Sequence, residues 1–439
     1  MTMRPSRRQL IAAGSMAAVA APFVKVARAQ EAAANRIHIG TVFPARTGLS
    51  TVLSSINDYP GEGGRNGAIL GETAVGELAL AAGVPLDVLL ASSPSVEAAR
   101  RAGERLVEAN NINILIGGVG EGQADILSQI AEEAQIPFFN VGEPSDALRA
   151  ACRRFTFHIE PSDAMYLDAL AMLGREKGYT RWFLIYPDDA AGQARMQRAT
   201  RALQTYSGGE VVGGAAVTKE QPVYANEANA IGRSGADVML VMLDAIDQIA
   251  FLNQMETLGV DLPPLVLPTA ITQTRDFTAT IRFLAAINNP RETLQSWETT
   301  YTANGAEAFN QRYLARWSEA VDPTGWATYH AIKIAFDVHQ TIGTLDGPAV
   351  VEYLESPEAV FDVLKGPGTS FRPWDHQLRQ PIQVVRVDQE VEWIRANLQS
   401  RVAIAAYERD LPVAAEGGDI VATLDQLGDG PDDLVCAAP

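Results

Sequence analysis

Residues 111–143 read NINILIGGVGEGQADILSQIAEEAQIPFFNVGE and predict a strand, a glycine-rich turn, a helix and a second strand. The apolar residues of 112–116 span the length of a strand, and the glycines at 117, 118, 120 and 122 permit a tight turn with close backbone approach. A helix over about 124–134 then points its N-terminal amides at the space above the turn. Residues 136–141 form the next strand, and adjacent strand ends of this kind are where open α/β sheets bind ligands. The alternative is that these glycines serve only the close packing of strand and helix.

Strands and helices alternate along most of the remaining chain. Strands are expected over 36–42, 84–90, 182–186, 211–217 and 237–242, with helices between them. This βαβα order predicts an α/β fold in which helices cover both faces of parallel sheets. The pattern starts again after residues 155–160, so we expect two Rossmann-like lobes.

Length and composition indicate a soluble globular protein. The 439 residues allow two or three domains, and 47% of them are hydrophobic while 20% are charged. The formal net charge of −18 argues against nucleic acid as a partner, because phosphate binding requires clustered Lys and Arg.

The first 29 residues have the features of an export signal. Arg7 and Arg8 precede an apolar stretch over 11–24, which is shorter than the roughly 20 residues that a membrane span requires. Ala27-Arg28-Ala29 then has the small-x-small form of a cleavage site. We predict a twin-arginine-type signal over residues 1–29 and a periplasmic mature chain that starts at Gln30. An ordinary Sec signal is the alternative.

Both cysteines, Cys152 and Cys436, lie in the mature chain. A pair of cysteines can form a disulfide in the oxidising periplasm, and this one would tie the C-terminus to the first third of the chain. Free buried thiols are the alternative. Two cysteines cannot form a cysteine-rich zinc site by themselves, and we predict no metal site.

Nine short phrases, in a fixed order, carry a family resemblance. The chain resembles type I periplasmic solute-binding proteins, which serve ABC transporters for branched-chain amino acids and amides, over about residues 37–394. The phrases are IHIG (37–40), RNGA (65–68), LIGG (115–118), AQIP (134–137), FTFHIEP (155–161), YPDD (186–189), ADV (236–238), FLNQ (251–254) with LG (258–259), and ATYHA (327–331).

The resemblance implies two lobes joined by three crossovers, a ligand held between them and closure by hinge motion. Residues 36–155 and about 270–365 are expected to form lobe 1. Residues 156–269 and about 370–398 are expected to form lobe 2, with a C-terminal tail over 399–439. The implied function is capture of a small solute and its delivery to a membrane permease and its ATPase, without a cofactor and without chemistry of its own.

A narrower likeness lies near the C-terminus. SFRPWDHQLRQP at 370–381, LDQLG at 424–428 and the late Cys436 are similar to binding proteins associated with quinoprotein (PQQ-dependent) alcohol dehydrogenase systems. This likeness implies a setting of periplasmic alcohol oxidation and does not imply that the chain binds the quinone. We interpret Trp374, which lies between turn residues, as a structural clamp.

The resemblance indicates which positions are candidate ligand residues, but the residue types at these positions differ from those of the amino-acid-binding members. Amino-acid-binding members offer Ser and Thr hydroxyls in the turn after the LIGG phrase, whereas this chain has Gly120, Glu121 and Gly122 there. The next ligand loop falls on Glu143 and Ser145, where only the serine keeps a hydroxyl. In lobe 2 the aromatic residue expected after Asp189 is missing, and Asp244 follows the strand over 238–243.

These acidic residues predict a neutral or cationic ligand rather than an amino acid. Carboxylates beside a helix N-terminus repel a ligand carboxylate and favour cations or hydrogen-bond donors. The alternative is that the acids are merely solvated in an acidic protein. The aromatic residues positioned to line the ligand site are Tyr59, Tyr186, Trp326 and Tyr329.

Catalytic motifs are missing from the sequence. The five histidines form neither H-E-x-x-H nor H-x-x-E-H, and there is no G-x-S-x-G elbow or P-loop. Gly118-Val119-Gly120 matches half of a dinucleotide fingerprint, but its third glycine is replaced by Gln123. An exported Rossmann-type oxidoreductase is therefore the alternative from another class. A ligand-sensing receptor subunit of the same fold is the third reading.

Overall fold

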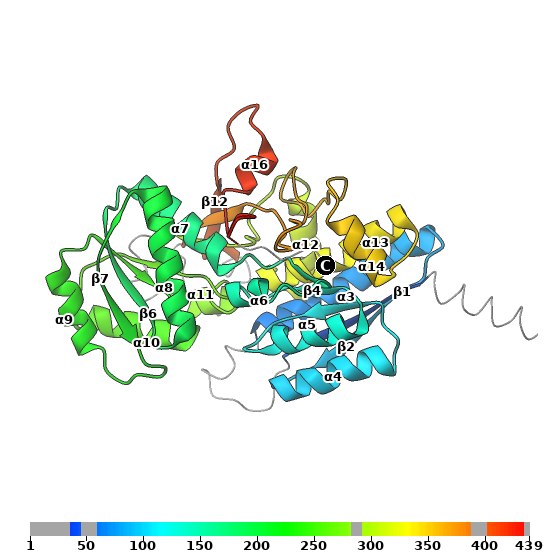
Figure 1. Cartoon of the computed structure of the whole chain (residues 1–439), viewed down its shortest axis with the longest axis horizontal. Helices are drawn as coiled ribbons and strands as arrows, with labels where there is room; N and C mark the ends of the chain where they lie inside the picture. Colours follow the sequence, from blue (N-terminus) through cyan, green and yellow to red (C-terminus); the bar gives the residue numbers. More distant parts are fainter. Residues whose placement is uncertain (1–35, 45–58, 282–291, 388–401, 434–439) are drawn as a thin grey trace, which may run out of the picture.

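The computed structural model describes residues 36–44, 59–281, 292–387 and 402–433. Two lobes lie side by side along the long axis of the molecule, and each is built on a parallel sheet with helices on both faces (Figure 1). A third, smaller sheet lies between them. In the part of the chain that the structure describes, no helix is long and apolar enough to cross a membrane.

The first lobe contains a five-stranded parallel sheet with the order β2-β1-β3-β4-β5. Its central strands are buried on both faces and rich in branched residues, as expected for parallel strands between helix layers. The strands are β1 (Ile37–Phe43), β2 (Leu86–Ser92), β3 (Ile114–Gly117), β4 (Phe138–Asn140) and β5 (Thr156–His158).

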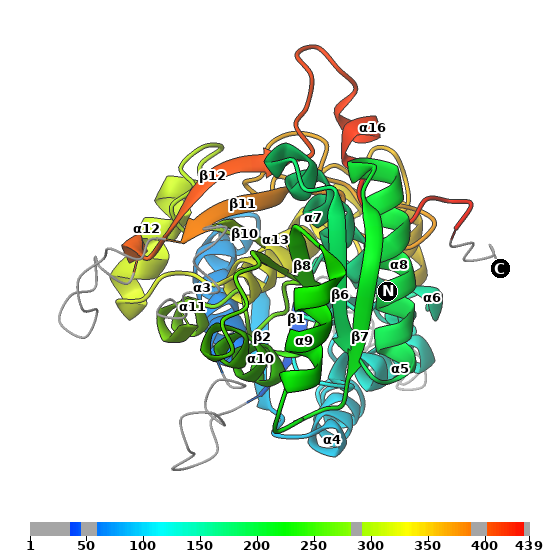
Figure 2. The same ribbon diagram turned by 90° about the vertical axis from the view of Figure 1, so that its left-hand side faces the viewer.

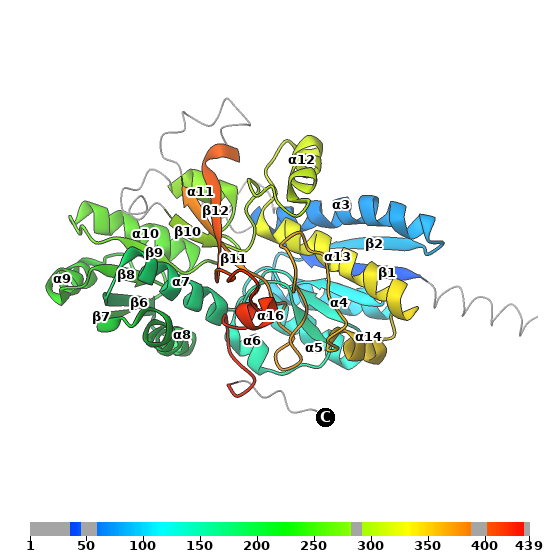
Figure 3. The ribbon, with the colours of Figure 1, turned by 90° about the horizontal axis from the view of Figure 1, so that it is seen from above.

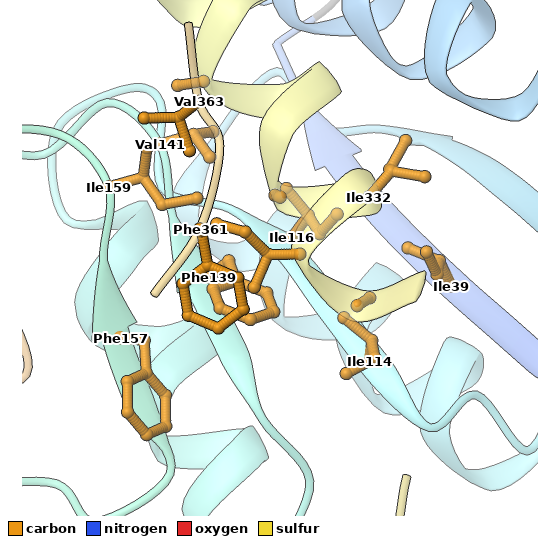
Figure 4. Packing of buried hydrophobic residues seen from close by; sticks show 14 of the residues in the cluster. Ile39, Ile114, Ile116, Phe139, Val141, Phe157, Ile159, Ile332, Phe361 and Val363 are labelled. Atoms are coloured by element: carbon orange, nitrogen blue, oxygen red, sulfur yellow. The ribbon is translucent and has the colours of Figure 1, made fainter. Parts of the chain in front are cut away.

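Two apolar cores cover the two faces of this sheet. On one face Ile39, Ile114 and Phe139 pack against Ile332 and other residues of the long helices (Figure 4). On the other face α4 and α5 bury Leu106 and Leu127. The helices of this lobe are α3 (Tyr59–Ala81), α4 (Val96–Glu108), α5 (Gln123–Ala134), α6 (Asp146–Ala150), α12 (Ala306–Trp317), α13 (Pro323–Ile342) and α14 (Gly347–Leu354).

The second lobe contains a four-stranded parallel sheet with the order β7-β6-β8-β9, seen at the front of Figure 2. One face packs on α7 and α8, and the other on α9 and α10. The elements are β6 (Arg181–Pro187), β7 (Glu210–Val217), β8 (Val238–Val241), β9 (Pro264–Val266), α7 (Asp163–Lys177), α8 (Ala190–Ala202) with a π-helical turn over Leu203–Ser207, α9 (Ala225–Ser234), α10 (Ala245–Thr257) and α11 (Arg275–Ile281).

A three-stranded antiparallel sheet, here the linking sheet, lies between the lobes (Figure 3). It consists of β10 (Glu292–Gln295), β11 (Ile382–Val387) and β12 (Ala405–Leu411), and the short helix α16 (Ile420–Leu424) follows it. Leu294, Ile382 and Leu411 belong to the core of the second lobe, whereas Tyr407 packs against the core of the first. The linking sheet is therefore shared by both lobes.

Within the described residues the chain passes between the two cores at 159–165, 294–297 and 378–382, since the residues that flank each passage belong to different cores. The second passage comes later than the boundary predicted near residue 270, because α11 and β10 precede it. The segment predicted as a tail over 399–439 also differs from that description, because β12 pairs with β11 from Ala405 to Leu411, with one register shift. The predicted α/β class with two parallel-sheet lobes is confirmed.

Helices α3 and α13 cross in backbone contact. A Cβ atom added at Gly67 would lie 2.2 Å from the carbonyl oxygen of Gly325, which is far inside contact distance. We expect Gly67→Ala to lower the free energy of unfolding by about 1–3 kcal/mol through overpacking. Gly76→Ala is the control in the same helix, because its Cβ would meet nothing within 4 Å. Urea denaturation should show loss for the first variant and no loss for the second, and equal midpoints would contradict the close crossing.

Candidate functional site

The carboxyl ends of the two parallel sheets face each other. Glu121 follows β3 and Lys219 follows β7, and these side chains form an ion pair with 3.3 Å between Oε2 and Nζ. The amide of Asp163, at the start of α7, donates to the carbonyl oxygen of Pro144 at 2.7 Å. The loops after the strand ends of both lobes therefore meet. We call these loops the facing edges: residues 118–123 and 142–146 of the first lobe, and 187–189, 217–220 and 242–247 of the second.

The glycine-rich turn forms one part of the first lobe's edge. Gly118, Gly120 and Gly122 have φ values of 94°, 98° and 71°, a region that side chains disfavour. The side chain of Gln123, the first residue of α5, folds back onto Ser93. Its Oε1 accepts a hydrogen bond from the Ser93 hydroxyl, and its Nε2 donates one to the Ser93 carbonyl oxygen. Gly120, Glu121 and Gly122 remain exposed, so the structure places these three predicted residues at the facing edge.

Glu143 and Ser145 lie beside that turn, after β4. Both are partly buried, and Glu143 Oε1 accepts a hydrogen bond from the Ser145 amide at 3.0 Å. Burial raises the pKa of the Glu143 carboxyl, and the bond from Ser145 opposes the rise. The charge of Asp163 in the second lobe raises this pKa further, whereas Arg149 and Arg195 lower it. The pKa of Glu143 therefore depends on charges in both lobes.

Arg195 is a charged residue beside the facing edges that sequence reasoning missed. It lies in α8, and its Nε donates to Asp163 Oδ2 at 2.8 Å. The charge of Asp163 is the main cause that raises the pKa of Arg195, and Asp244 and Glu143 add to it. The other oxygen of Asp163, Oδ1, is buried and has no hydrogen-bond partner among the described residues. The available signal was the spacing of Arg195 and Arg198, which puts both on one helix face.

Asp189 and Asp244 are both N-cap residues, and they differ in what their side chains do. Asp189 Oδ1 accepts a hydrogen bond from the Gly192 amide at 2.7 Å, an ordinary cap of α8. Asp244 precedes α10 and makes no side-chain cap bond. It is exposed and close enough to Arg195 to affect its pKa. Asp244 is thus more available to a ligand than Asp189.

The structure contradicts one residue of the predicted aromatic lining, and the others stay predictions. Tyr186 is partly buried against the core of the second lobe, and Tyr329 against that of the first. Trp326 lies in the first-lobe core with no exposed surface, its ring stacked on Trp297 with 5.3 Å between centroids, so its expected place at the ligand site was wrong. Its position in the first turn of α13, and not in a loop, explains the burial. Tyr59 is the first residue of α3, and its side chain lies outside what the structure describes.

A cavity in the second lobe lies away from the facing edges, and the described residues contain no candidate metal site. A cavity of about 400 Å³ lies at the amino-terminal edge of the second sheet and is lined by α9 and by the loop before β9, including Ala228, Gly232 and Leu258. It does not touch the facing edges. In the described ranges no group of three or more His, Cys, Asp or Glu side chains could hold a metal ion. Cys436 lies outside them, so its pairing with Cys152 stays a prediction.

Two parallel-sheet lobes, joined by several passages of the chain and meeting at their carboxyl edges, define a two-lobed binding protein. The chain belongs to the periplasmic binding protein family, whose model matches residues 44–392. No curated protein matches the chain.

Solved structures agree on the fold. A branched-chain amino acid ABC transporter periplasmic ligand-binding protein from Burkholderia xenovorans is 17% identical, with a TM-score of 0.71 over 85% of this chain and 94% of that one. A solute-binding protein from Rhodopseudomonas palustris in complex with 3,4-dihydroxybenzoic acid is 16% identical, with a TM-score of 0.66 over 86% and 96%. A leucine-binding protein from Thermotoga maritima is 13% identical, with a TM-score of 0.64 over 85% and 97%.

These findings confirm the resemblance to type I periplasmic solute-binding proteins and the predicted class of function, a solute-binding protein. Membership of the family also implies the periplasm. The twin-arginine signal lies in residues outside the described ranges and stays a prediction, as does the association with quinoprotein dehydrogenase systems.

Proposed function

We propose that the chain captures a small solute between its two lobes and delivers it to the permease and ATPase of an ABC transporter, after export through a twin-arginine-type signal. The family supports solute binding, and the solved structures of similar fold include binding proteins of ABC transporters. A ligand between the lobes would stabilise the closed form by its higher affinity for that form. Delivery without chemistry, rather than catalysis or sensing, is part of the proposal.

We further propose that the solute is neutral or cationic. The observation that carries this is the charge at the facing edges and on the helix starts beside them, where Glu121, Glu143, Asp163 and Asp244 outnumber Arg195 and Lys219. Both cations already have carboxylate partners, Asp163 for Arg195 and Glu121 for Lys219. These carboxylates would repel the carboxylate of a ligand, whereas they would attract an ammonium group and accept hydrogen bonds from a hydroxyl group.

Isothermal titration with a panel of butylamine, butanol, leucine and 4-hydroxybenzoate tests this assignment. We expect butylamine to bind, and Glu143→Gln to weaken that binding by about tenfold through loss of a charge-assisted hydrogen bond. Because burial raises the pKa of Glu143, affinity for the amine should fall as the pH drops through that pKa. Glu133→Gln, an exposed position on α5, is the control and should leave the affinity unchanged.

A small carboxylic acid is the competing ligand, because Arg195 would bind it if Asp163 were displaced. The Rhodopseudomonas palustris protein in complex with 3,4-dihydroxybenzoic acid makes this class worth testing. Tight binding of leucine or 4-hydroxybenzoate that is lost in Arg195→Met, and kept in Glu121→Ala and Glu143→Gln, would refute the neutral or cationic ligand.

A further inference from the structure

Two sequence phrases that ligand binding does not explain form one structural unit. The turn over 370–381 and the segment over 424–428 are far apart in sequence, yet Arg372 Nε and Arg379 Nε both donate to Asp425 Oδ1, at 3.1 and 2.8 Å. Arg372 also donates to the carbonyl oxygens of Leu424 and Leu427. We call residues 419–429 the C-terminal brace.

Trp374 completes this contact. Its Nε1 donates to the carbonyl oxygen of Asp429 at 3.1 Å. The guanidinium carbons of Arg372 and Arg379 lie 5.6 and 5.2 Å from the centroid of its ring, within the range of cation–π attraction. Trp374 therefore holds the two arginines that bind Asp425, which agrees with its interpretation as a structural clamp.

The turn over 370–381 is attached to the first lobe. Gln377 forms a parallel bridge with His158, so this strand-like segment extends the first sheet beyond β5. The His376 ring stacks on Phe157 with 4.4 Å between centroids, and its Nδ1 lies 3.0 Å from the carbonyl oxygen of Thr156. The C-terminal brace, which binds to this turn, is thereby attached to the first lobe.

The opposite side of the brace is attached to the second lobe. The Gly428 amide donates to Asp168 Oδ2 at 2.8 Å, and Arg198 binds both oxygens of Asp168 as well as Asp429 Oδ1, at 2.9 Å. The Tyr206 hydroxyl donates to the Gln426 carbonyl oxygen, and Leu427 is fully buried in the second-lobe core. Figure 3 shows α16, the helix of the brace, over the junction of the two lobes.

Gly428 marks the point where the three parts meet. A Cβ atom at this position would lie 2.9 Å from Arg372 Nη1 and 3.0 Å from Met165 Cγ. A first-lobe side chain, Arg372, and a second-lobe side chain, Met165, therefore both pack closely against the brace there. Rotation of one lobe against the other must therefore strain or break one set of these contacts. Breaking a largely buried charge contact leaves an uncompensated charge, which is unfavourable.

We propose that the C-terminal brace favours the arrangement in which the facing edges touch, and so sets the balance between closed and open lobes. Asp425 binds it to the first-lobe turn, and Asp429 and Gly428 bind it to α7 and α8. The device is independent of which solute the protein binds and goes beyond solute capture itself. It also assigns a structural purpose to both phrases of the narrower sequence likeness.

The ion pair of Glu121 and Lys219 supplies a readout for this balance. A carbodiimide couples an amine to a carboxylate only when the two are in contact, so the yield of the Lys219–Glu121 cross-link, measured by mass spectrometry of peptides, reports on closed lobes. We expect the double variant Asp425→Asn/Asp429→Asn to lower this yield by about threefold, because the Asn oxygens can still accept hydrogen bonds from the arginines and only the charge is lost. Small-angle scattering should show a larger radius of gyration.

Asp432→Asn is the matched control, because Asp432 is exposed and close in sequence, and its cross-link yield should equal that of the natural chain. An unchanged or higher yield in a folded double variant would overturn the proposal. If the double variant does not unfold cooperatively, Trp374→Phe decides, since it removes only the bond to Asp429 and should still lower the yield. No solute is added, so failure here leaves the ligand assignment standing, and failure of the titrations leaves the brace standing.

Discussion

Arg149→Met is expected to lower the free energy of unfolding by about 3–5 kcal/mol, because it removes a buried charge whose partners remain in place. Arg149 is 2% exposed and lies in α6. Its guanidinium donates to the carbonyl oxygens of Glu143 and Ser145, to that of Glu160 at 2.6 Å, and to Gln377 Oε1 at 2.9 Å. One side chain thus joins the Glu143 loop to the first passage between the lobes and to Gln377, which directly precedes the third.

The loss would have two physical parts. The buried side-chain oxygen of Gln377 would lose its donor among the described residues, which is unfavourable by roughly 1–3 kcal/mol. The carbonyl oxygens of Glu143, Ser145 and Glu160 would each keep a neutral donor but lose the bond from a charged one. The buried carboxyls of Glu143 and Glu160 would also lose a positive charge that lowers their pKa. Both effects oppose folding at neutral pH.

Arg153→Met is the control for this experiment. Arg153 lies four positions later and pairs with Asp125, which is largely exposed, at 2.8 Å. A pair of this kind stabilises a protein by about 0–1 kcal/mol. Urea denaturation at pH 7 should separate the two variants clearly. Similar midpoints for both would mean that the contacts of Arg149 do not support the junction of the lobes.

The sequence predicted the parallel sheets because their signals are local. The apolar run expected over 112–116 is β3 (Ile114–Gly117), and the helix expected over 124–134 is α5 (Gln123–Ala134). Each depends on residues within one strand or one turn of helix. The linking sheet was not predicted as a unit, because β10 pairs with β11 about ninety positions later, and local patterns do not specify such partners.

Side-chain contacts between distant segments account for what was missed at the candidate site. Arg149 bonds to Gln377, 228 positions away, and Arg195 bonds to Asp163, 32 positions away. In the sequence, neither arginine differs from an ordinary polar residue on the surface of a helix. The positions of Glu121, Glu143 and Asp244 at one edge could be predicted for a different reason: each follows a strand within four residues, and the ends of parallel strands meet at one edge. Their contact with a ligand stays a prediction.

Glu160→Gln is expected to flatten the dependence of stability on pH and to stabilise the protein above pH 7. Glu160 lies in the first passage between the lobes and is 1% exposed. Burial raises the pKa of its carboxyl from 4.5 to about 7, against the hydrogen bond from Tyr166 and the charge of Arg149. The folded protein therefore binds this proton more tightly than the unfolded chain does.

The sign of the effect follows directly. The contribution of Glu160 to stability is fully present below the unfolded pKa of about 4.5 and is lost as the pH rises through about 7. The loss is on the order of 3 kcal/mol. The Gln side chain keeps an oxygen for the Tyr166 hydroxyl, 2.8 Å away, and cannot ionise. The variant should match the natural protein near pH 5 and exceed its stability at pH 8.

Other buried groups also make stability depend on pH, so Glu160→Gln should reduce that dependence without abolishing it. Burial raises the pKa of Asp322 to about 7 as well, so the variant should still lose some stability between pH 5 and 8. Lys365, whose pKa burial lowers to about 7, changes its contribution only above that pH. Urea midpoints at pH 5, 6, 7 and 8 for the natural protein, Glu160→Gln and the exposed control Glu108→Gln test this. Parallel curves for all three proteins would show that Glu160 is ionised in the folded state without penalty, and that the first passage tolerates a buried charge.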